Sequence, residues 1–347
     1  MRNCNECIFC ANLRNKNNFI FNKQVTKEEY EEFKKNLKLD TKEGIEKAKK
    51  QYEEFMQTQP RKYLEVTQCE NSMGDYLKSC KNAKICFDGY NLEDVSYSTH
   101  VYNAKDCMDW DFVANKAELC YEMVSSAHNL FNCKFCMNCW NGNQDLTYCD
   151  LCLGSKKCFG CVGLRNGKYC ILNKEYSEEE YEALVPKIIE HMKRTGEWGE
   201  FFHASMSPFA YNESVAHEYT PLTKEQALAK NLQWHDEDKK DYQPQTYQVP
   251  NSIEEVKDEI LNEVLACEEC GKNYKIIKQE LFFYRQNKLS IPQKCFNCRH
   301  KSRMDSRNPR ILFDDKCAKC STPIKTTYDP KRGLPIYCEK CYLEHVD

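Results

Sequence analysis

Apolar side chains recur at helical intervals in two long stretches of the chain. In residues 26–58 they return every three or four positions, with a break near Thr41, and Thr26 forms a capping box with Glu29. Pro60 stands where the pattern stops, as expected just beyond a helix end. This spacing predicts a hairpin of two amphipathic helices that packs its apolar side on the rest of the protein.

The second helical stretch follows Ser177, which repeats the capping box with Glu180. An aromatic, irregular run comes after this helix and leads to a short helix capped by Thr223. Residues 235–250 are polar, contain two prolines and are predicted to form a linker. A further helix is expected over about residues 253–265.

Between residues 61 and 176 the helical spacing disappears. Cys and aromatic positions recur about 9 to 16 residues apart, every second one after about 21–26, and Asn-rich breaks separate short apolar runs. Short strands with Asn at the corners are typical of a parallel β-solenoid, in which each turn buries one face against its neighbours. Asn tolerates left-handed corners and can pair with the Asn of the next turn. An irregular Cys-rich α+β domain is the alternative.

The N-terminus repeats the end of this region without a gap. At an offset of about 151 residues, Cys7 falls on Cys158 and Tyr30 on Tyr181. Residues 1–25 therefore resemble the tail of a first unit, too short to bury a core alone. We expect this partial repeat coil to stack on the rest of the chain or on another molecule, unless the sequence begins inside a longer protein.

Charge is unevenly distributed along the chain. Residues 267–347 hold 17 Lys and Arg against 10 Asp and Glu, a net charge of +7, whereas the whole chain carries -3. A basic C-terminal part predicts that a polyanionic partner binds there. The chain opens on polar sequence without a signal peptide and has no apolar run long enough for a membrane span. We expect a cytoplasmic protein with no membrane partner.

Eight C-terminal cysteines occur as four CxxC pairs. They are Cys267, Cys270, Cys295, Cys298, Cys317, Cys320, Cys338 and Cys341. Two thiolates on one tight turn can reach the same ion, and four of them complete the tetrahedral shell of a structural zinc. The spacing predicts two zinc ions in a double ribbon. Sequential pairing is favoured, and a crossed pairing of the first and third CxxC stays open.

Thirteen further cysteines lie between Cys69 and Cys170, several of them at CxxC spacing. Residues i and i+3 of a regular strand face opposite sides, so such a pair can chelate only at a bend. The first interpretation is a ladder of small buried side chains. An additional zinc or iron–sulfur site is the second.

Together the patterns predict a mixed α/β protein: a Cys-rich parallel β-solenoid-like body with flanking helices and a C-terminal two-site zinc-ribbon module. The expected order is a partial coil at 1–25, a helical hairpin at 26–60, the solenoid at 61–176, capping helices and a wrap segment at 177–234, a linker at 235–250 and the double ribbon at 251–347.

A basic stretch follows Cys298. Arg299, Arg303 and Arg307 are four residues apart and would share one face of a helix. The candidate nucleic-acid-binding set is Lys294, Arg299, Lys301, Arg303, Arg307 and Arg310. This stripe could follow a phosphate backbone of RNA or DNA, or form a solvated or protein-contacting face. The aromatic residues Tyr274, Phe282, Phe283 and Tyr284 could stack on bases, but filling the ribbon core is the favoured interpretation.

No catalytic motif is present: the chain has no P-loop, GxGxxG turn, GxSxG or HExxH. A four-cysteine zinc shell leaves no open position for catalysis. The prediction is therefore a non-enzymatic scaffold that binds zinc and engages nucleic acid or a nucleoprotein. A protein-assembly module that associates through the N-terminal coil is the alternative, and an enzyme acting on a polymer along the solenoid face is more remote.

The segment from Cys267 to Arg299 resembles the "probable zinc-binding" ribbon domain family. Members pair a CxxCG turn, an aromatic run before a proline, and a CxxCR turn that leads into a basic helix; Gly271, Pro292 and Arg299 stand at the matching positions. Residues 158–189 and the segment after them resemble uncharacterised bacterial Cys-rich repeat proteins that carry such ribbons. The resemblance implies zinc bound through the C-terminal cysteines.

Overall fold

The computed structural model describes residues 1–114, 117–127, 131–236 and 240–346. The chain forms two compact units. One consists of Leu64–His235 together with Arg310–Leu312, and the other of Met1–Tyr63, Asp236–Pro309 and the residues from Phe313 onward. The first is called the coil stack below, and the second the ribbon unit.

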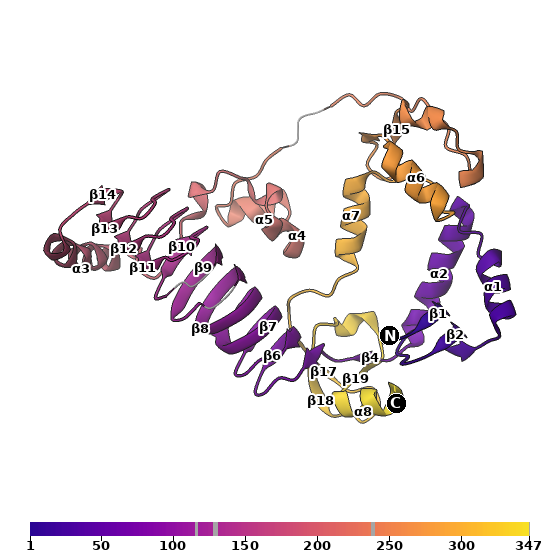
Figure 1. Ribbon diagram of the computed structural model, residues 1–347, viewed down its shortest axis with the longest axis horizontal. Helices are drawn as coiled ribbons and strands as arrows, with labels where there is room; N and C mark the ends of the chain where they lie inside the picture. The colour runs from indigo at the N-terminus through magenta and orange to yellow at the C-terminus, as the bar shows by residue number, and fades with distance from the viewer. Residues whose placement is uncertain (115–116, 128–130, 237–239, 347) are drawn as a thin grey trace. The chain divides into compact units, whose positions relative to one another are not determined.

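The coil stack contains a ten-stranded sheet whose strands follow one another in chain order (Figure 1). The strands are β5 (Val66–Thr67), β6 (Met73–Lys78), β7 (Lys84–Ser96), β8 (Thr99–Ala114), β9 (Cys120–Ala127), β10 (Lys134–Met137), β11 (Gln144–Thr147), β12 (Lys156–Phe159), β13 (Lys168–Ile171) and β14 (Lys174–Glu175). Every pairing is parallel except the last, between β13 and β14. The predicted mixed α/β class with a long parallel sheet is therefore confirmed.

Paired positions in the stack lie about 12 residues apart. Tyr90 pairs with Tyr102 and Cys158 with Cys170, and isolated bridges such as Trp140–Leu153 repeat a similar offset elsewhere in the same turns. This offset lies within the spacing of about 9 to 16 residues at which Cys and aromatic positions recur in the sequence.

Within each turn, buried positions return every third residue. Leu77, Cys80, Ala83 and Cys86 follow one another at this interval and are all almost completely buried. The residue before each of them has a positive φ. A left-handed residue at every third position turns the backbone, so that i and i+3 both point inward. The bend that the sequence reasoning required for both cysteines of a CxxC to face the same way is therefore present.

Asparagine occupies many of these left-handed positions, as the sequence predicted, since its short polar side chain tolerates a positive φ. The amides also form ladders between turns. Asn71 Nδ2 donates to Asn82 Oδ1 at 2.9 Å, and Asn82 Nδ2 donates to Asp94 Oδ1 at 2.8 Å. Each ladder fixes the register of neighbouring turns at the corner where the chain bends.

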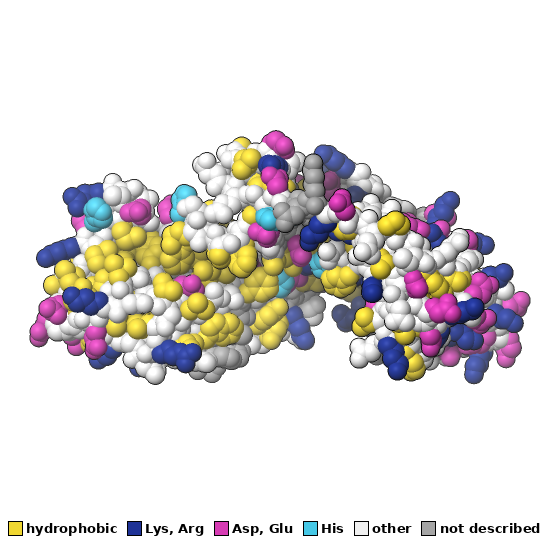
Figure 2. Space-filling model, turned by 90° about the horizontal axis from the view of Figure 1, so that it is seen from above, with side chains coloured by type: hydrophobic (Ala, Val, Ile, Leu, Met, Phe, Trp, Pro, Cys, Tyr) yellow, Lys and Arg dark blue, Asp and Glu magenta, His cyan; other side chains and the backbone are white. Residues whose placement is uncertain are grey.

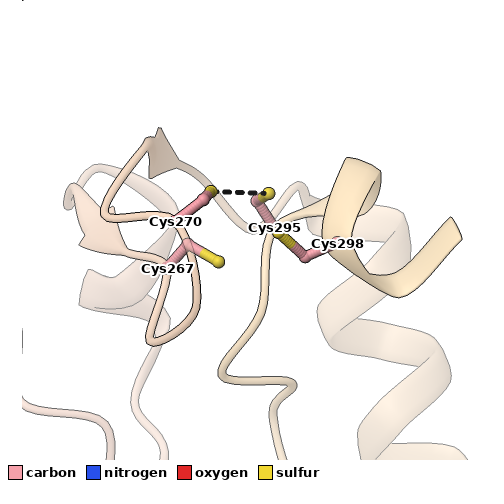
Figure 3. A group of neighbouring side chains, drawn as sticks. All are labelled: Cys267, Cys270, Cys295 and Cys298. Atoms are coloured by element: carbon pink, nitrogen blue, oxygen red, sulfur yellow. Dashed lines mark hydrogen bonds between the residues drawn. The ribbon is translucent and has the colours of Figure 1, made fainter. Parts of the chain in front are cut away.

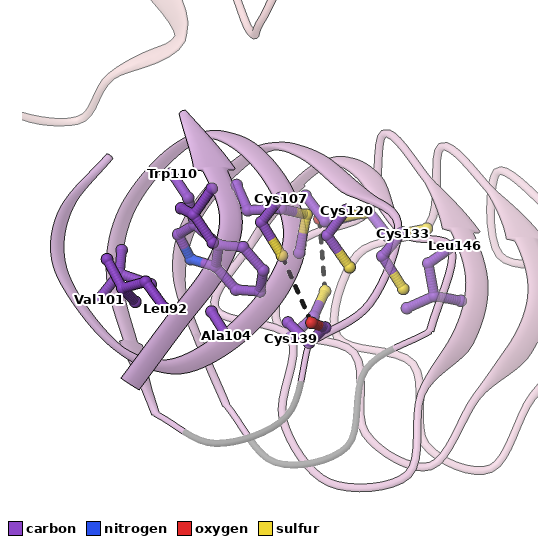
Figure 4. Packing of buried hydrophobic residues seen from close by; sticks show 14 of the residues in the cluster. Leu92, Val101, Ala104, Cys107, Trp110, Cys120, Cys133, Cys139 and Leu146 are labelled. Carbon is purple, nitrogen blue, oxygen red and sulfur yellow. Dashed lines mark hydrogen bonds between the residues drawn. The ribbon is translucent and has the colours of Figure 1, made fainter. Parts of the chain in front are cut away.

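The interior cysteines bond to the backbone of their own and the following turn (Figure 4). The Sγ–H of Cys152 lies 3.4 Å from the carbonyl oxygen of Asp150 and 3.5 Å from that of Cys161. Ser155, also inward, makes the same pair of contacts with Leu153 and Leu164. These groups donate to carbonyls inside the stack. Burial raises the pKa of the Cys86 thiol to about 11, which keeps that thiol protonated.

Helix α3 (Glu178–Thr195) covers the last turn of the stack (Figure 1). Its predicted capping box is present, and Tyr181 is buried in a cluster with Phe159 and Ile171. The segment after α3 returns along the stack, where the Tyr148 hydroxyl accepts from Gly199 N. It includes η1 (Ala204–Met206), η2 (Tyr211–Glu213), α4 (Val215–Tyr219) and α5 (Lys224–Ala229). On the face drawn in Figure 2, hydrophobic side chains gather over the coil stack.

The N-terminus of the ribbon unit has the structure of the stack's end. β1 (Asn5–Ile8), β2 (Asn17–Ile20), β3 (Lys23–Gln24) and α1 (Lys27–Asn36) reproduce β12, β13, β14 and the start of α3. The pairing register is also the same, since Cys7 faces Phe19 where Cys158 faces Cys170. Helix α2 (Lys42–Thr58) completes the predicted helical hairpin.

Two small ribbons make up the rest of this unit. The first contains η3 (Ile253–Glu255), η4 (Asp258–Leu261), β15 (Leu265–Ala266), β16 (Asn273–Tyr274), α6 (Lys278–Gln286) and α7 (Phe296–Asp305). The second contains β17 (Phe313–Lys316), β18 (Pro323–Thr326), η5 (Pro330–Arg332), β19 (Ile336–Tyr337) and α8 (Glu339–Val346).

The helix predicted over residues 253–265 is wrong. Two short 3-10 helices stand there, and Ile253, Val256 and Ile260 are all buried in the core of the first ribbon. Residues three apart lie on the same side of a 3-10 helix, which matches the spacing of Ile253 and Val256. Part of the predicted linker also packs on this ribbon, since Gln243 and Thr246 bond to Asn273 and Val264.

Both ribbons pack against the N-terminal hairpin. In the first ribbon, Ser290 N donates to the carbonyl of Leu39, and Glu268 pairs with Lys42 at 2.5 Å. In the second, β19 pairs with β4 (Arg61–Lys62), just after α2. The C-terminal cysteines are thus built into a unit that includes the chain's first sixty residues.

Among the described residues, no helix has the length and apolarity needed to cross a membrane.

The thiol contacts predict the effect of substitutions at Cys152. Cys152→Ser should lower the free energy of unfolding by less than about 1 kcal/mol, because a hydroxyl can still donate its one proton to either carbonyl. Cys152→Ala should cost about 1–2 kcal/mol, because it removes the donor and leaves a void. Urea unfolding followed by circular dichroism measures both values. Equal losses for Ser and Ala would show that volume alone matters at this position.

Candidate metal centres

The first group of cysteines joins a tight turn to the start of a helix. Cys267 follows β15, and Gly271 N donates back to the Cys267 carbonyl at 2.9 Å. Gly271 has a φ of +70°, a conformation that glycine adopts without strain. Cys295 lies directly before α7, and Cys298 lies in its first turn. Two separate pieces of backbone therefore present two sulfurs each.

All four sulfurs converge on one point. The Sγ atoms of Cys267, Cys270, Cys295 and Cys298 lie within 4.8 Å of one another, and those of Cys270 and Cys295 are 3.7 Å apart (Figure 3). Burial raises the pKa of Cys267, but the backbone N–H groups of Cys270 and Cys295 outweigh it and lower the value to about 6. Cys267 therefore favours the thiolate form that binds metal.

The second group repeats this plan. Cys317 follows β17, Ser321 N donates to its carbonyl at 2.8 Å, and Ser321 takes the positive φ that Gly271 has in the first group. Cys338 directly precedes α8, whose early residues include the fourth ligand, Cys341. The four sulfurs again lie within 4.8 Å of one another.

Each group can hold one metal ion. The cysteines come together in sequential order, so the geometry corresponds to the first of the two pairings that the sequence left open. Four thiolates with no carboxylate or histidine are the donor set of a structural zinc site, and they fill its tetrahedral shell. The residues present therefore fit zinc at both sites.

The interior cysteines of the coil stack are arranged differently. Outside the two C-terminal groups, the part of the chain that the structure describes brings no three Cys, His, Asp or Glu ligand atoms within 4.8 Å of one another. Cys149 and Cys161 each belong to a CxxC pair of the stack. Their thiols are directed at backbone carbonyls. This geometry matches the buried-ladder interpretation.

Three of the predicted basic residues are paired with carboxylates. Lys294 contacts Glu269 at 2.6 Å, Lys301 contacts Asp305 at 2.7 Å, and Arg299 lies 3.5 Å from Glu280. Arg303 is exposed on α7 and Arg307 is also exposed. The predicted stripe on one helix is wrong at Arg307, because α7 ends at Asp305.

Arg310 belongs to the compact unit that contains the coil stack, whereas the other members of the predicted set belong to the ribbon unit. Its guanidinium contacts Asp88 at 2.9 Å and the ring of His100, and it lies 3.9 Å from the centre of the Tyr219 ring. The carboxylate and the aromatic face both hold this cation. Arg310 therefore anchors its own segment to the stack.

The aromatic residues of the first ribbon divide into two sets. Tyr274 and Tyr284 pack against the ribbon core, as predicted, but Phe282 is 67% exposed and Phe283 is 53% exposed. The expectation that all four fill the core is wrong, because α6 is short and buries only the face that carries Leu281.

Phe296 is a residue that sequence reasoning missed. It is 64% exposed at the start of α7, and its ring stacks on His300 with an angle of 9° between planes. Its spacing to His300 and Arg303 was the available signal, since residues four and seven apart share a helix face. An exposed phenylalanine stacked on a half-buried histidine, and an exposed arginine, thus stand on the helix that begins at the metal site.

Comparisons with models of known protein families, with curated proteins and with solved structures found no match for this chain. Function is therefore inferred below from the chain's own residues.

Metal content tests the two centres separately. Native mass spectrometry of the full chain should show two zinc ions, and Cys270→Ser or Cys320→Ser should each remove one of them, since three thiolates bind more weakly than four. Chelation of the wild type should lower the melting temperature of the ribbon unit. A third ion, or iron, would contradict the assignment of the interior cysteines to packing.

Proposed function

We propose that this protein is a non-enzymatic, zinc-dependent scaffold whose first ribbon binds single-stranded nucleic acid. The supporting observation is the exposure of Phe282, Phe283 and Phe296 on a small metal-held ribbon. Solvent-exposed phenylalanines are costly unless a partner covers them, and stacked bases are such a partner. The coil stack, which we propose closes into a β-solenoid, is the scaffold.

The metal positions this aromatic surface. Cys295 and Cys298 belong to the ligand group, and α7 begins at Cys295, so zinc fixes the start of the helix that carries Phe296 and Arg303. A ribbon of this size has a small apolar core, so the ion supplies much of its folding free energy. Loss of zinc should therefore remove binding together with the local fold.

The charge of the ribbon favours stacking over phosphate contact. Lys294, Lys301 and Arg299 have carboxylate neighbours, while Arg303 and Arg307 are exposed. Acidic and basic side chains are also interspersed over the ribbon unit on the face drawn in Figure 2. Two exposed arginines can make few contacts with the phosphates of a duplex, whereas unpaired bases can stack on aromatic rings. Single strands are therefore the proposed ligand.

Binding to a fluorescent single-stranded oligonucleotide tests this proposal. Phe282→Ala and Phe283→Ala should each weaken binding about tenfold, because each removes a surface for one base. Two phosphate contacts predict a slope of log K against log salt of about -1.4, and Arg303→Glu should make it shallower by about 0.7. Fluorescence anisotropy at several salt concentrations measures these values.

Phe209→Ala is the matched control, since Phe209 is 62% exposed but belongs to the coil stack. It should leave binding unchanged. Failure of the wild-type protein, loaded with two zinc ions, to bind RNA or DNA at low salt would contradict the proposal.

A specific observation favours a second candidate function, self-association through the N-terminal coil. β12 is paired on both sides, by β11 and β13, whereas its counterpart β1 pairs only with β2 among the described strands. An exposed strand edge is a template for another chain. We propose that β1 of one copy pairs with a second copy.

Light scattering of the full chain across a concentration series measures this association. Removing residues 1–25, which contain β1, β2 and β3, should shift the protein toward the monomer, since the deletion removes all three strands of this sheet and leaves no new edge in their place. A circular dichroism melt of the truncated chain checks that the coil stack still folds. An unchanged oligomeric state would assign the contact to another surface.

A further inference from the structure

A shallow groove lies on one side of the coil stack. It has a volume of about 530 Å³, and its lining includes Tyr76, Lys78, Asp88, Tyr90, Asn91 and Tyr102. All of these residues belong to the turns formed by β6, β7 and β8. The groove is therefore built on regular, paired backbone, which suits precise placement of its side chains.

Tyrosine rings form the apolar part of the groove. Tyr90 and Tyr102 are paired in register on neighbouring turns, and their rings stack with centroids 4.7 Å apart and 24° between planes. Tyr76 and Tyr90 are 58% and 42% exposed. The stacked pair covers one face of each ring, and the exposed parts of Tyr76 and Tyr90 leave aromatic surface in contact with solvent.

Uncharged and mutually compensating polar groups complete the groove. Asn91 Nδ2 donates to Asn103 Oδ1 at 2.8 Å in an amide ladder, which leaves its own carbonyl oxygen directed elsewhere. Asp88 contacts Arg310 at 2.9 Å, so its charge is already balanced. Lys78 is the one cation of the lining. The groove thus offers hydrogen-bond donors and acceptors without a row of like charges.

We propose that this groove binds a neutral polysaccharide chain lying along the stack. The C–H face of a pyranose ring packs on the negative face of an aromatic ring, and its hydroxyls match amide, carboxylate and ammonium partners. Neighbouring turns are spaced at the strand separation of about 4.8 Å, which is close to the length of one sugar unit in an extended chain. Successive sugars can therefore meet equivalent positions on successive turns.

A nucleic acid fits this groove less well. It carries one phosphate for every nucleotide and needs cations at a similar spacing. The lining supplies a single lysine. The site is also independent of the aromatic surface on the first ribbon, because it belongs to the other compact unit.

Isothermal titration of the full, zinc-loaded chain with cellohexaose, maltohexaose and chitohexaose tests the proposal. At least one of these neutral probes should bind. Tyr90→Ala should weaken that binding about tenfold, because it removes a stacking face. Tyr90→Phe should retain most of it, since the ring is kept, and this variant separates loss of stacking from loss of folding.

Tyr97→Ala is the matched control. Tyr97 is 43% exposed and directly follows the strand β7, but does not line the groove. It should bind the sugar probe as the wild type does. Absence of heat with all three probes would overturn the proposal, as would an equal loss in Tyr97→Ala. An oligouridylate that binds the wild type but not Tyr90→Ala would instead make the groove a nucleic-acid surface and refute the glycan assignment.

Discussion

A left-handed residue at every third position is the constraint on which the coil stack depends. It bends the chain often enough that side chains three apart all enter the interior. Many of these side chains are small, such as Cys, Ala and Ser, although Trp110 is also buried there, and Cys and Ser donate to interior carbonyls. The high cysteine content of this region and its many Asn and Asp corners have the same cause: one backbone geometry, repeated in each turn of about 12 residues.

Metal binding makes a different use of the same residue type. In the ribbons, a CxxC lies on a tight turn and meets a second CxxC at the start of a helix, so four sulfurs face one point. In the stack, a CxxC spans two inward positions of one turn, and each thiol meets a carbonyl instead. Local backbone conformation therefore decides whether two cysteines three residues apart act as ligands or as packing.

The two compact units offer different surfaces for binding. The first ribbon presents phenylalanine rings and arginines on elements ordered by its metal site, whereas the stack presents tyrosines and amides at regular intervals along paired strands. The first set suits bases and phosphates, and the second suits uncharged hydroxylated chains. The metal ligands fix the backbone under the first surface, and the pairing of neighbouring turns fixes the backbone under the second.

The sequence by itself determined the features that depend on local spacing. The helical hairpin, both capping boxes, the repeat that relates Cys7 to Cys158, the Asn corners and the eight candidate metal ligands all follow from residues close together in the chain. Only the tertiary structure decided the rest. The three-residue period was hidden because inward positions accept Cys, Ala, Leu, Ser and Trp alike, which blurs any hydrophobic pattern. The exposure of Phe282 and the pairing of Arg310 with Asp88 depend on which distant segments come together, and spacing along the chain carries no record of that.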